Sequence, residues 1–149
     1  MRVVVQRVSE GAVYIPAKKY TAEIKKGFVI LLGIKVGDEE KDVKFLAEKC
    51  VNLRICEDEN EKMNLSIKDI DGEILLISQF TLYGNASKGN RPGFTDSAKP
   101  EEAIPLYEKF ILYLKELLGE SKIKTGMFGE MMEVKIINDG PVTIIIDSK

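Results

Sequence analysis

The chain has no histidine among its 149 residues. Without imidazole there is no Ser-His-Asp or Cys-His catalytic set, no usual general base near neutral pH, and no supply of the commonest metal ligand. Only two cysteines are present, Cys50 and Cys56, and they are too far apart for a CxxC motif. Two thiols without histidine are too few ligands for a zinc site. We therefore expect no metal and no cofactor, so any chemistry must use other groups.

Long apolar runs, internal repeats and low-complexity tracts are also absent. No stretch approaches the roughly 18 apolar residues of a membrane-spanning helix. The first residues lack the apolar core and the small-residue cleavage site of a signal peptide. We expect a cytoplasmic protein with no membrane partner. Hydrophobic residues make up 44% and charged residues 31% of the chain, which is typical of a globular protein. One domain over residues 1–149 is the simplest organisation.

The net charge of −2 is unevenly distributed along the chain. Residues 1–30 carry six basic and two acidic side chains, whereas residues 31–76 carry seven basic and twelve acidic ones. Proteins that coat nucleic acid present a broad basic face. A general coat is therefore not expected, and DNA is not an expected partner. A local basic patch beside a site and an ordinary solvated surface both fit this composition.

Hydrophobic periodicity predicts an α+β domain with a mixed or antiparallel, barrel-like sheet and two main helices. The helices are expected at Asp38–Leu53 and Pro100–Leu118. The strands are expected at Arg2–Val8, Ala12–Ile15, Thr21–Ile24, Phe28–Ile34, Glu73–Phe80, Glu130–Ile137 and Val142–Asp147. Asp139-Gly140 is a strong hairpin signal, so a tight turn at Asn138–Pro141 is expected to join the last two strands.

Two segments carry polar groups next to predicted strands. Ser78-Gln79-Phe80-Thr81 ends a buried strand, where a rigid scaffold offers backbone N–H groups to a ligand. A hydroxyl nucleophile there would need a base that the segment lacks, so a binding wall is favoured. A cis bond at Gly140-Pro141 would aim two carbonyls the same way, as acceptors for an ammonium group. The plain alternatives are a strand that simply ends and an ordinary hairpin turn.

Two further segments combine glycines with an aromatic residue. Lys88–Phe94 adds two cations, Lys88 and Arg91, which suits binding of phosphate and stacking on a base. Gly126–Met132 places glycines on both sides of Phe128, which favours close approach of the backbone to another group. A solvated loop and a turn with methionine in the core are the respective alternatives.

Taken together, Ser78–Leu82 and Asn138–Thr143 resemble the two signature motifs of the D-aminoacyl-tRNA deacylases. Four other segments are similar to the same family: Met1–Val8, Lys62–Asn64, Lys88–Pro92 and Thr125–Gly129. Their order and spacing match along essentially the whole chain. The resemblance implies a homodimeric editing hydrolase that cleaves the ester joining a D-amino acid to the 3′-terminal adenosine of tRNA. It also implies removal of mischarged glycine.

The resemblance further implies roles for individual residues. Gly140 and Pro141 would form a cis pair that enters the partner subunit's pocket, presents carbonyls to the α-amino group and rejects L-substrates by clash. Arg7 would brace that pair. The remaining implied site residues are Ser78, Gln79, Phe80 and Thr81 as the catalytic pocket, Phe128 and Met132 near the adenosine, and Lys88 and Arg91 on tRNA phosphates.

The chain departs from the family pattern at Cys56, where an aromatic residue is common, and over the lysine-rich Ile15–Tyr20. Two other functions stay open at this point. One is a non-catalytic RNA- or metabolite-binding domain of the same fold. The other is an esterase that uses Thr81 as its nucleophile.

Overall fold

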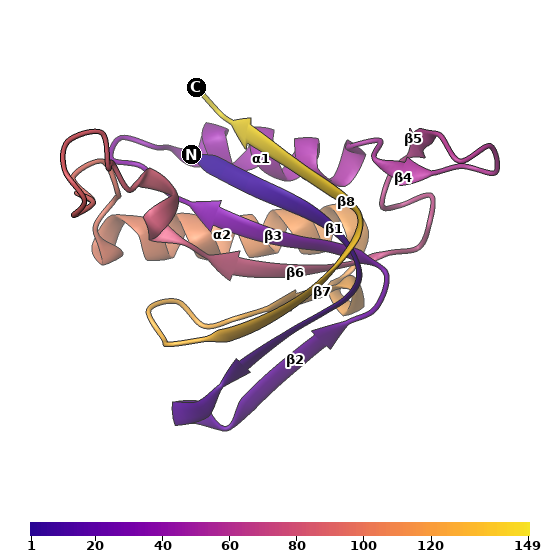
Figure 1. The fold of residues 1–149 in the computed structure, drawn as a ribbon, viewed down its shortest axis with the longest axis horizontal. Helices are drawn as coiled ribbons and strands as arrows, with labels where there is room; N and C mark the ends of the chain where they lie inside the picture. The colour runs from indigo at the N-terminus through magenta and orange to yellow at the C-terminus, as the bar shows by residue number, and fades with distance from the viewer.

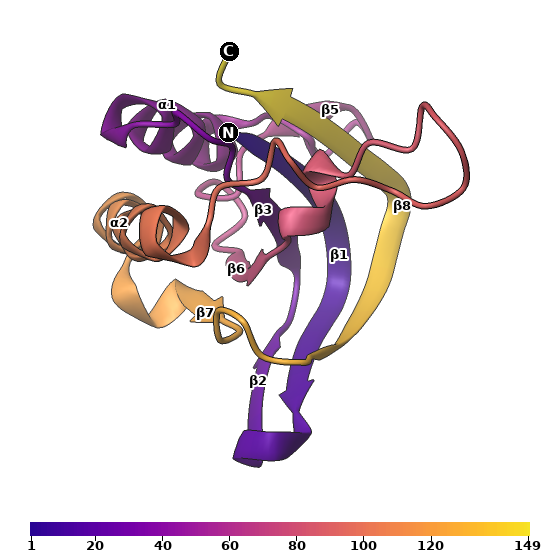
Figure 2. The same ribbon diagram turned by 90° about the vertical axis from the view of Figure 1, so that its left-hand side faces the viewer.

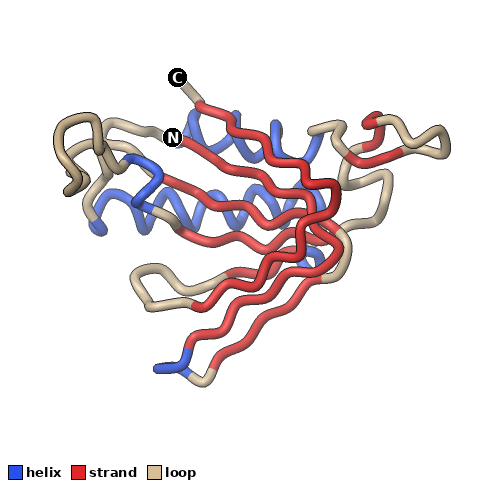
Figure 3. The backbone as a smooth tube through the Cα atoms, viewed as in Figure 1, coloured by secondary structure: helices blue, strands red, loops and turns tan.

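A strongly curved mixed sheet with both long helices on one side forms the frame of the molecule (Figures 1 and 3). The computed structural model describes all of residues 1–149. The main sheet contains β1 (Arg2–Ile15), β2 (Tyr20–Ile24), β3 (Gly27–Gly33), β6 (Glu73–Ser78), β7 (Ile123–Thr125) and β8 (Glu133–Asp147). A separate small hairpin contains β4 (Cys56–Glu57) and β5 (Met63–Leu65). The long helices are α1 (Glu40–Asn52) and α2 (Pro100–Leu118), and short 3-10 turns occur at η1 (Pro16–Lys18), η2 (Phe80–Tyr83) and η3 (Glu120–Lys122).

The strand order is β2-β1-β3-β6-β7, with β8 on the other side of β1. β1 is long enough to pair antiparallel with β3 through its first half and with β2 through its second half. The pairs β3–β6 and β6–β7 are parallel. The sheet curls into a nearly closed, barrel-like shape (Figure 2), which confirms the predicted fold class.

The apolar side chains divide into two clusters on opposite faces of the sheet. The larger cluster lies under the helices and includes Leu46 and Cys50 of α1 and Phe110 of α2. The smaller cluster fills the curl on the other face and includes Val13, Ile24 and Val29. Because β3 and β6 are covered on both faces, they read as continuous apolar runs in the sequence.

The predicted hairpin at the C-terminal end is wrong. β8 is one continuous strand, and both of its halves pair with β1 in the same antiparallel direction. Asn138 lies opposite Val8 and Thr143 lies opposite Gln6, so the four residues 139–142 face a single residue, Arg7. The Asp139–Val142 segment is therefore a bulge in β8 rather than a reversal. The peptide bond between Gly140 and Pro141 within it is cis.

The remaining differences concern the number and the ends of elements. The strands predicted at Arg2–Val8 and Ala12–Ile15 are one continuous strand, β1, and the helix predicted at Asp38–Leu53 spans Glu40–Asn52. The strand predicted to reach Phe80 ends at Ser78, and a 3-10 turn begins two residues later. The helix Pro100–Leu118 has the predicted bounds, with Pro100 in its first turn and Gly119 at its C-cap. The short strands β4, β5 and β7 have no counterpart in the predicted set. No helix combines the length and the apolar composition needed to cross a bilayer.

Candidate functional site

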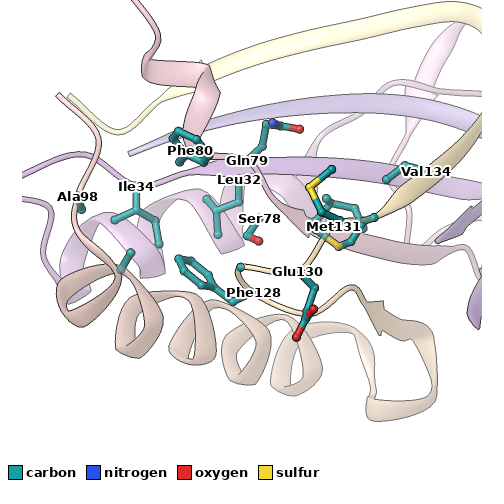
Figure 4. A pocket seen from close by; sticks show the side chains of 14 residues that line it. Leu32, Ile34, Ser78, Gln79, Phe80, Ala98, Phe128, Glu130, Met131 and Val134 are labelled. Carbon is teal, nitrogen blue, oxygen red and sulfur yellow. The ribbon is translucent and has the colours of Figure 1, made fainter. Parts of the chain in front are cut away.

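A cavity of about 320 Å³ opens at the carboxyl ends of the parallel strands β3 and β6 (Figure 4). Ligands of parallel sheets commonly bind at this end of the strands. Ten of the 14 lining residues are hydrophobic. The lining residues are Leu32, Ile34, Ile77, Ser78, Gln79, Phe80, Ala98, Ala103, Phe128, Gly129, Glu130, Met131, Met132 and Val134. The cavity therefore suits a largely apolar or aromatic group.

Two backbone donors beside the cavity have no partner in the chain. The N–H of Gln79 completes the sheet by donating to the carbonyl of Leu32 at 2.8 Å. The chain then turns into η2, and the N–H groups of Phe80 and Thr81, its first two residues, have no acceptor. The start of a helical turn leaves such donors free. They are available to a negatively charged or carbonyl oxygen.

The aromatic ring of Phe80 forms the outer edge of the cavity. It is 56% exposed and packs edge-to-face on Phe94, with ring centroids 5.1 Å apart. Ser97 Oγ donates to the carbonyl of Phe80 at 2.9 Å, so the loop 84–99 is folded back onto η2. Lys88 and Arg91 are exposed in this loop and do not line the cavity.

The opposite wall is formed by Phe128 and Met132. Phe128 packs on the ring of Tyr107 at 5.8 Å, and Tyr107 Oη donates to the carbonyl of Leu76 at 3.4 Å. Burial raises the pKa of Tyr107, so its hydroxyl stays protonated and acts as a support. Gly126 donates to the same Leu76 carbonyl at 3.1 Å, which ties the loop carrying Phe128 to β6.

Thr81 lies outside the cavity, in contrast to Ser78, Gln79 and Phe80. Its side chain is exposed, and its Oγ1 accepts a hydrogen bond from Gln79 Nε2 at 2.5 Å. An amide nitrogen cannot take a proton from a hydroxyl, so Thr81 has no base beside it. This geometry disfavours Thr81 as a nucleophile.

Glu130 is the only ionisable residue among those that line the cavity. Its carboxylate lies 3.4 Å from Nζ of Lys18, and Figure 4 shows it pointing away from Ser78. Motif reasoning placed this residue in a glycine-flanked segment without giving it a role. A turn brings Glu130 to the cavity. The backbone N–H of Glu130 closes this turn by donating to the carbonyl of Met127 at 3.3 Å. No group of three or more His, Cys, Asp or Glu side chains is placed to hold a metal ion.

Arg7, Gly140 and Pro141 form a second cluster, apart from the cavity. Arg7 is 4% exposed. Its Nε donates to the carbonyl of Asp139 at 3.0 Å and its Nη1 to that of Ile55 at 2.8 Å. The guanidinium thus joins the bulge of β8 to the β4–β5 hairpin. None of the three residues lines the cavity, although Gly140 and Pro141 are themselves exposed.

Fold and site together define a class: an α+β protein with a curled mixed sheet and an apolar, histidine-free pocket beside free backbone donors. A family model described as D-Tyr-tRNA(Tyr) deacylase matches residues 4–147. A protein of Flavobacterium psychrophilum named D-aminoacyl-tRNA deacylase is 55% identical over all of this chain and 98% of its own. One of the same name from Halalkalibacterium halodurans is 51% identical over the full length of both chains.

Two solved structures share the fold. One, titled c-Myc DNA Unwinding Element Binding Protein, is 39% identical with a TM-score of 0.93, covering 100% of this chain and 99% of its own. The other, titled as a probable eukaryotic D-amino acid tRNA deacylase, has a TM-score of 0.83 at 15% identity over 98% of each chain. The chain therefore belongs to the D-Tyr-tRNA(Tyr) deacylase family, which is a family of hydrolases. This confirms the resemblance seen in the motifs.

Proposed function

We propose that the protein hydrolyses the ester bond between a D-amino acid and the 3′-terminal adenosine of tRNA, and that it removes mischarged glycine in the same way. The observation that carries this proposal is the pair of free N–H groups at Phe80 and Thr81 beside an apolar cavity. Membership of the deacylase family supports the same conclusion. Charged tRNA is used in the cytoplasm, which is where we place the activity.

The chemistry needs no side-chain base. Water attacks the ester carbonyl carbon, the carbonyl oxygen becomes an oxyanion, and collapse releases the amino acid and the 3′-hydroxyl of tRNA. The N–H groups of Phe80 and Thr81 stabilise the oxyanion, and one such donor is typically worth about 2.7–4 kcal/mol. The adenosine 2′-hydroxyl assists the proton transfer, which suits a chain without histidine.

Each wall of the cavity binds a different part of the substrate. Ser78 and Gln79 lie at the reacting ester, and Phe128 and Met132 contact the terminal adenosine. Lys88 and Arg91, exposed in the loop that packs on Phe80, hold tRNA phosphates.

Selection against L-substrates is proposed to need a second copy of the chain. Gly140 and Pro141 are exposed and lie outside their own subunit's cavity, so they are free to enter the cavity of a partner in a homodimer. There, their carbonyls would accept from the α-ammonium of the substrate, and an L-side chain would clash with them.

The direct test is the rate at which D-tyrosine and L-tyrosine are released from matched tyrosyl-tRNAs, without added metal. We expect rapid release of D-tyrosine and an intact L-ester. Release of neither would favour a non-catalytic binding domain of this fold, and equal release of both would contradict the proposed filter. Thr81→Ala should retain most of the activity. Loss of activity with intact tRNA binding, together with a burst of acyl-enzyme in the original protein, would favour the Thr81 esterase.

A further inference from the structure

No cationic side chain lines the cavity, although the substrate proposed for it is the 3′ end of tRNA, a polyanion. No Lys or Arg is among the 14 lining residues. The phosphate on the 5′ side of a terminal adenosine is covalently attached to that nucleoside. It must therefore lie at the edge of any cavity that holds the adenosine. A cation at this edge would lower the cost of bringing the phosphate there.

Lys18 is the cation that the structure places at this edge. It forms the only ion pair that involves a lining residue, with its Nζ 3.4 Å from the Glu130 carboxylate. Its side chain is 52% exposed, so a second anion can reach the ammonium. Lys19, the next residue, is exposed as well and has no ion pair.

The tip that carries Lys18 is held in place beside the cavity. Tyr20 Oη donates to the carbonyl of Thr125 at 2.9 Å, which links the β1–β2 hairpin to the segment that leads into the cavity wall. Tyr20 also packs on the apolar cluster against which Met127 and Met132 are packed. Both contacts are made by Tyr20, two residues after Lys18, and they hold this side of the hairpin tip against the segment that leads into the wall.

The hairpin tip also has a counterpart across the cavity. Figure 1 places it at the same end of the molecule as the loop 84–99, with the loop 126–132 between them. The loop 84–99, which packs on Phe80 through Phe94, and the tip that carries Lys18 thus lie on two sides of the loop 126–132 (Figure 1).

We propose that Lys18 binds a phosphate of the tRNA 3′ end, and that Glu130 holds its ammonium in position until the phosphate arrives. This inference rests on the proposed function. Exposed ion pairs are weak, so a phosphate that brings its own charge can replace the carboxylate. Glu130 then acts as a competitor of the phosphate, and its removal should strengthen RNA binding.

Two substitutions distinguish phosphate binding by Lys18 from a purely structural role, in which the Lys18–Glu130 ion pair only holds the hairpin tip against the loop 126–132. Full-length Lys18→Ala and Glu130→Gln are compared with the original protein for the Kd of uncharged tRNA and for the KM of D-tyrosyl-tRNA. Lys18→Ala should raise both by roughly three- to tenfold in low salt, with the effect on KM rather than kcat. It should also reduce the slope of log Kd against log salt concentration by about 0.7–0.9. Glu130→Gln should lower both constants.

The matched control is Lys44→Ala, which removes one exposed lysine from α1. No residue of α1 lines the cavity. This substitution should leave both constants unchanged. If Lys18→Ala and Glu130→Gln shift Kd and KM in the same direction, the ion pair has only a structural role and the proposal is overturned. An unchanged Kd or salt slope in Lys18→Ala, with an unchanged melting temperature, would overturn it too. If the original protein binds tRNA but releases no amino acid, the proposed function fails, and the shift in Kd still decides the role of Lys18.

Discussion

Gly126 sits where the chain enters the cavity wall, and the structure leaves no room there for a side chain. A Cβ atom would lie 2.4 Å from Met132 Sδ and 3.2 Å from Ile77 Cδ1. The backbone of Gly126 has no positive φ, so the requirement for glycine comes from close packing alone. Because the thioether is the flexible partner, the side chain of Met132 would move first, and it lines the cavity.

Gly126→Ala should therefore damage the site more than the fold. We expect a loss of about 1–3 kcal/mol in the free energy of unfolding, as for other overpacked positions. We expect kcat/KM for D-tyrosyl-tRNA to fall on the order of tenfold or more, because small displacements of a binding wall are costly. Gly93→Ala is the control, since nothing lies within 4 Å of a Cβ there. Unchanged kinetics in Gly126→Ala would contradict the role given to Met132.

At the residue scale, the sequence predicts those site residues that belong to a contiguous motif. Ser78, Gln79 and Phe80 line one cavity wall because they follow one strand without interruption. Ala98 and Glu130 line the same cavity from other elements, and no local pattern links them to Ser78. Their contribution depends on how α2 and the turn before β8 pack, which is a tertiary property.

At the scale of elements, predictions succeed where local chemistry decides and fail where pairing decides. The bounds of α2 follow from Pro100 and Gly119, whose backbone preferences act locally. The Asp-Gly signal instead predicts a reversal at Asn138–Pro141, whereas both flanking segments pair with β1. Val134 and Ile144 find the apolar partners Val13 and Val5 on that one strand. Burial along the full length of β1 outweighs the turn preference of two residues.

The bulge of β8 depends on Arg7, which connects three elements. Arg7→Met would remove the donors to the carbonyls of Asp139 and Ile55 and leave them unpaired. We expect a loss of about 2–4 kcal/mol in the free energy of unfolding, measured by urea titration, because unsatisfied buried acceptors are expensive. Arg2→Met is the control. It removes a pair with Asp147 whose side chains are 36% and 39% exposed, together with a donor to the carbonyl of Leu82 at 3.2 Å. Exposed pairs of this kind contribute about 0–1 kcal/mol. Equal losses in the two variants would contradict a bracing role for Arg7.

At the scale of the whole molecule, the residues implied by the two signature motifs do not meet within one copy. The cavity lies at the carboxyl ends of β3 and β6, while Gly140 and Pro141 lie beside Arg7 and the β4–β5 hairpin. The sequence contains both motifs but does not show that they lie apart in space. The proposed function reconciles them through a homodimer, in which each cavity receives the bulge of the other subunit.

Mixing a variant of the cavity with a variant of the bulge tests this arrangement directly. Ala98→Phe should fill the cavity and leave the bulge intact, because Ala98 lines the cavity. Gly140→Ala should disturb only the bulge, since a Cβ there would lie 2.9 Å from Val142 Cγ2 and 3.0 Å from an Arg7 nitrogen at a φ of +127°. Pro141→Ala is a second bulge variant in case the first does not fold.

Each variant alone should discriminate poorly between D- and L-tyrosyl-tRNA or release neither amino acid. After subunit exchange, half of the dimers are mixed and each contains one complete site. D-selective activity should then return to about a quarter of the original. No recovery, with exchange verified by native mass spectrometry, would show that the bulge acts within its own subunit or not at all.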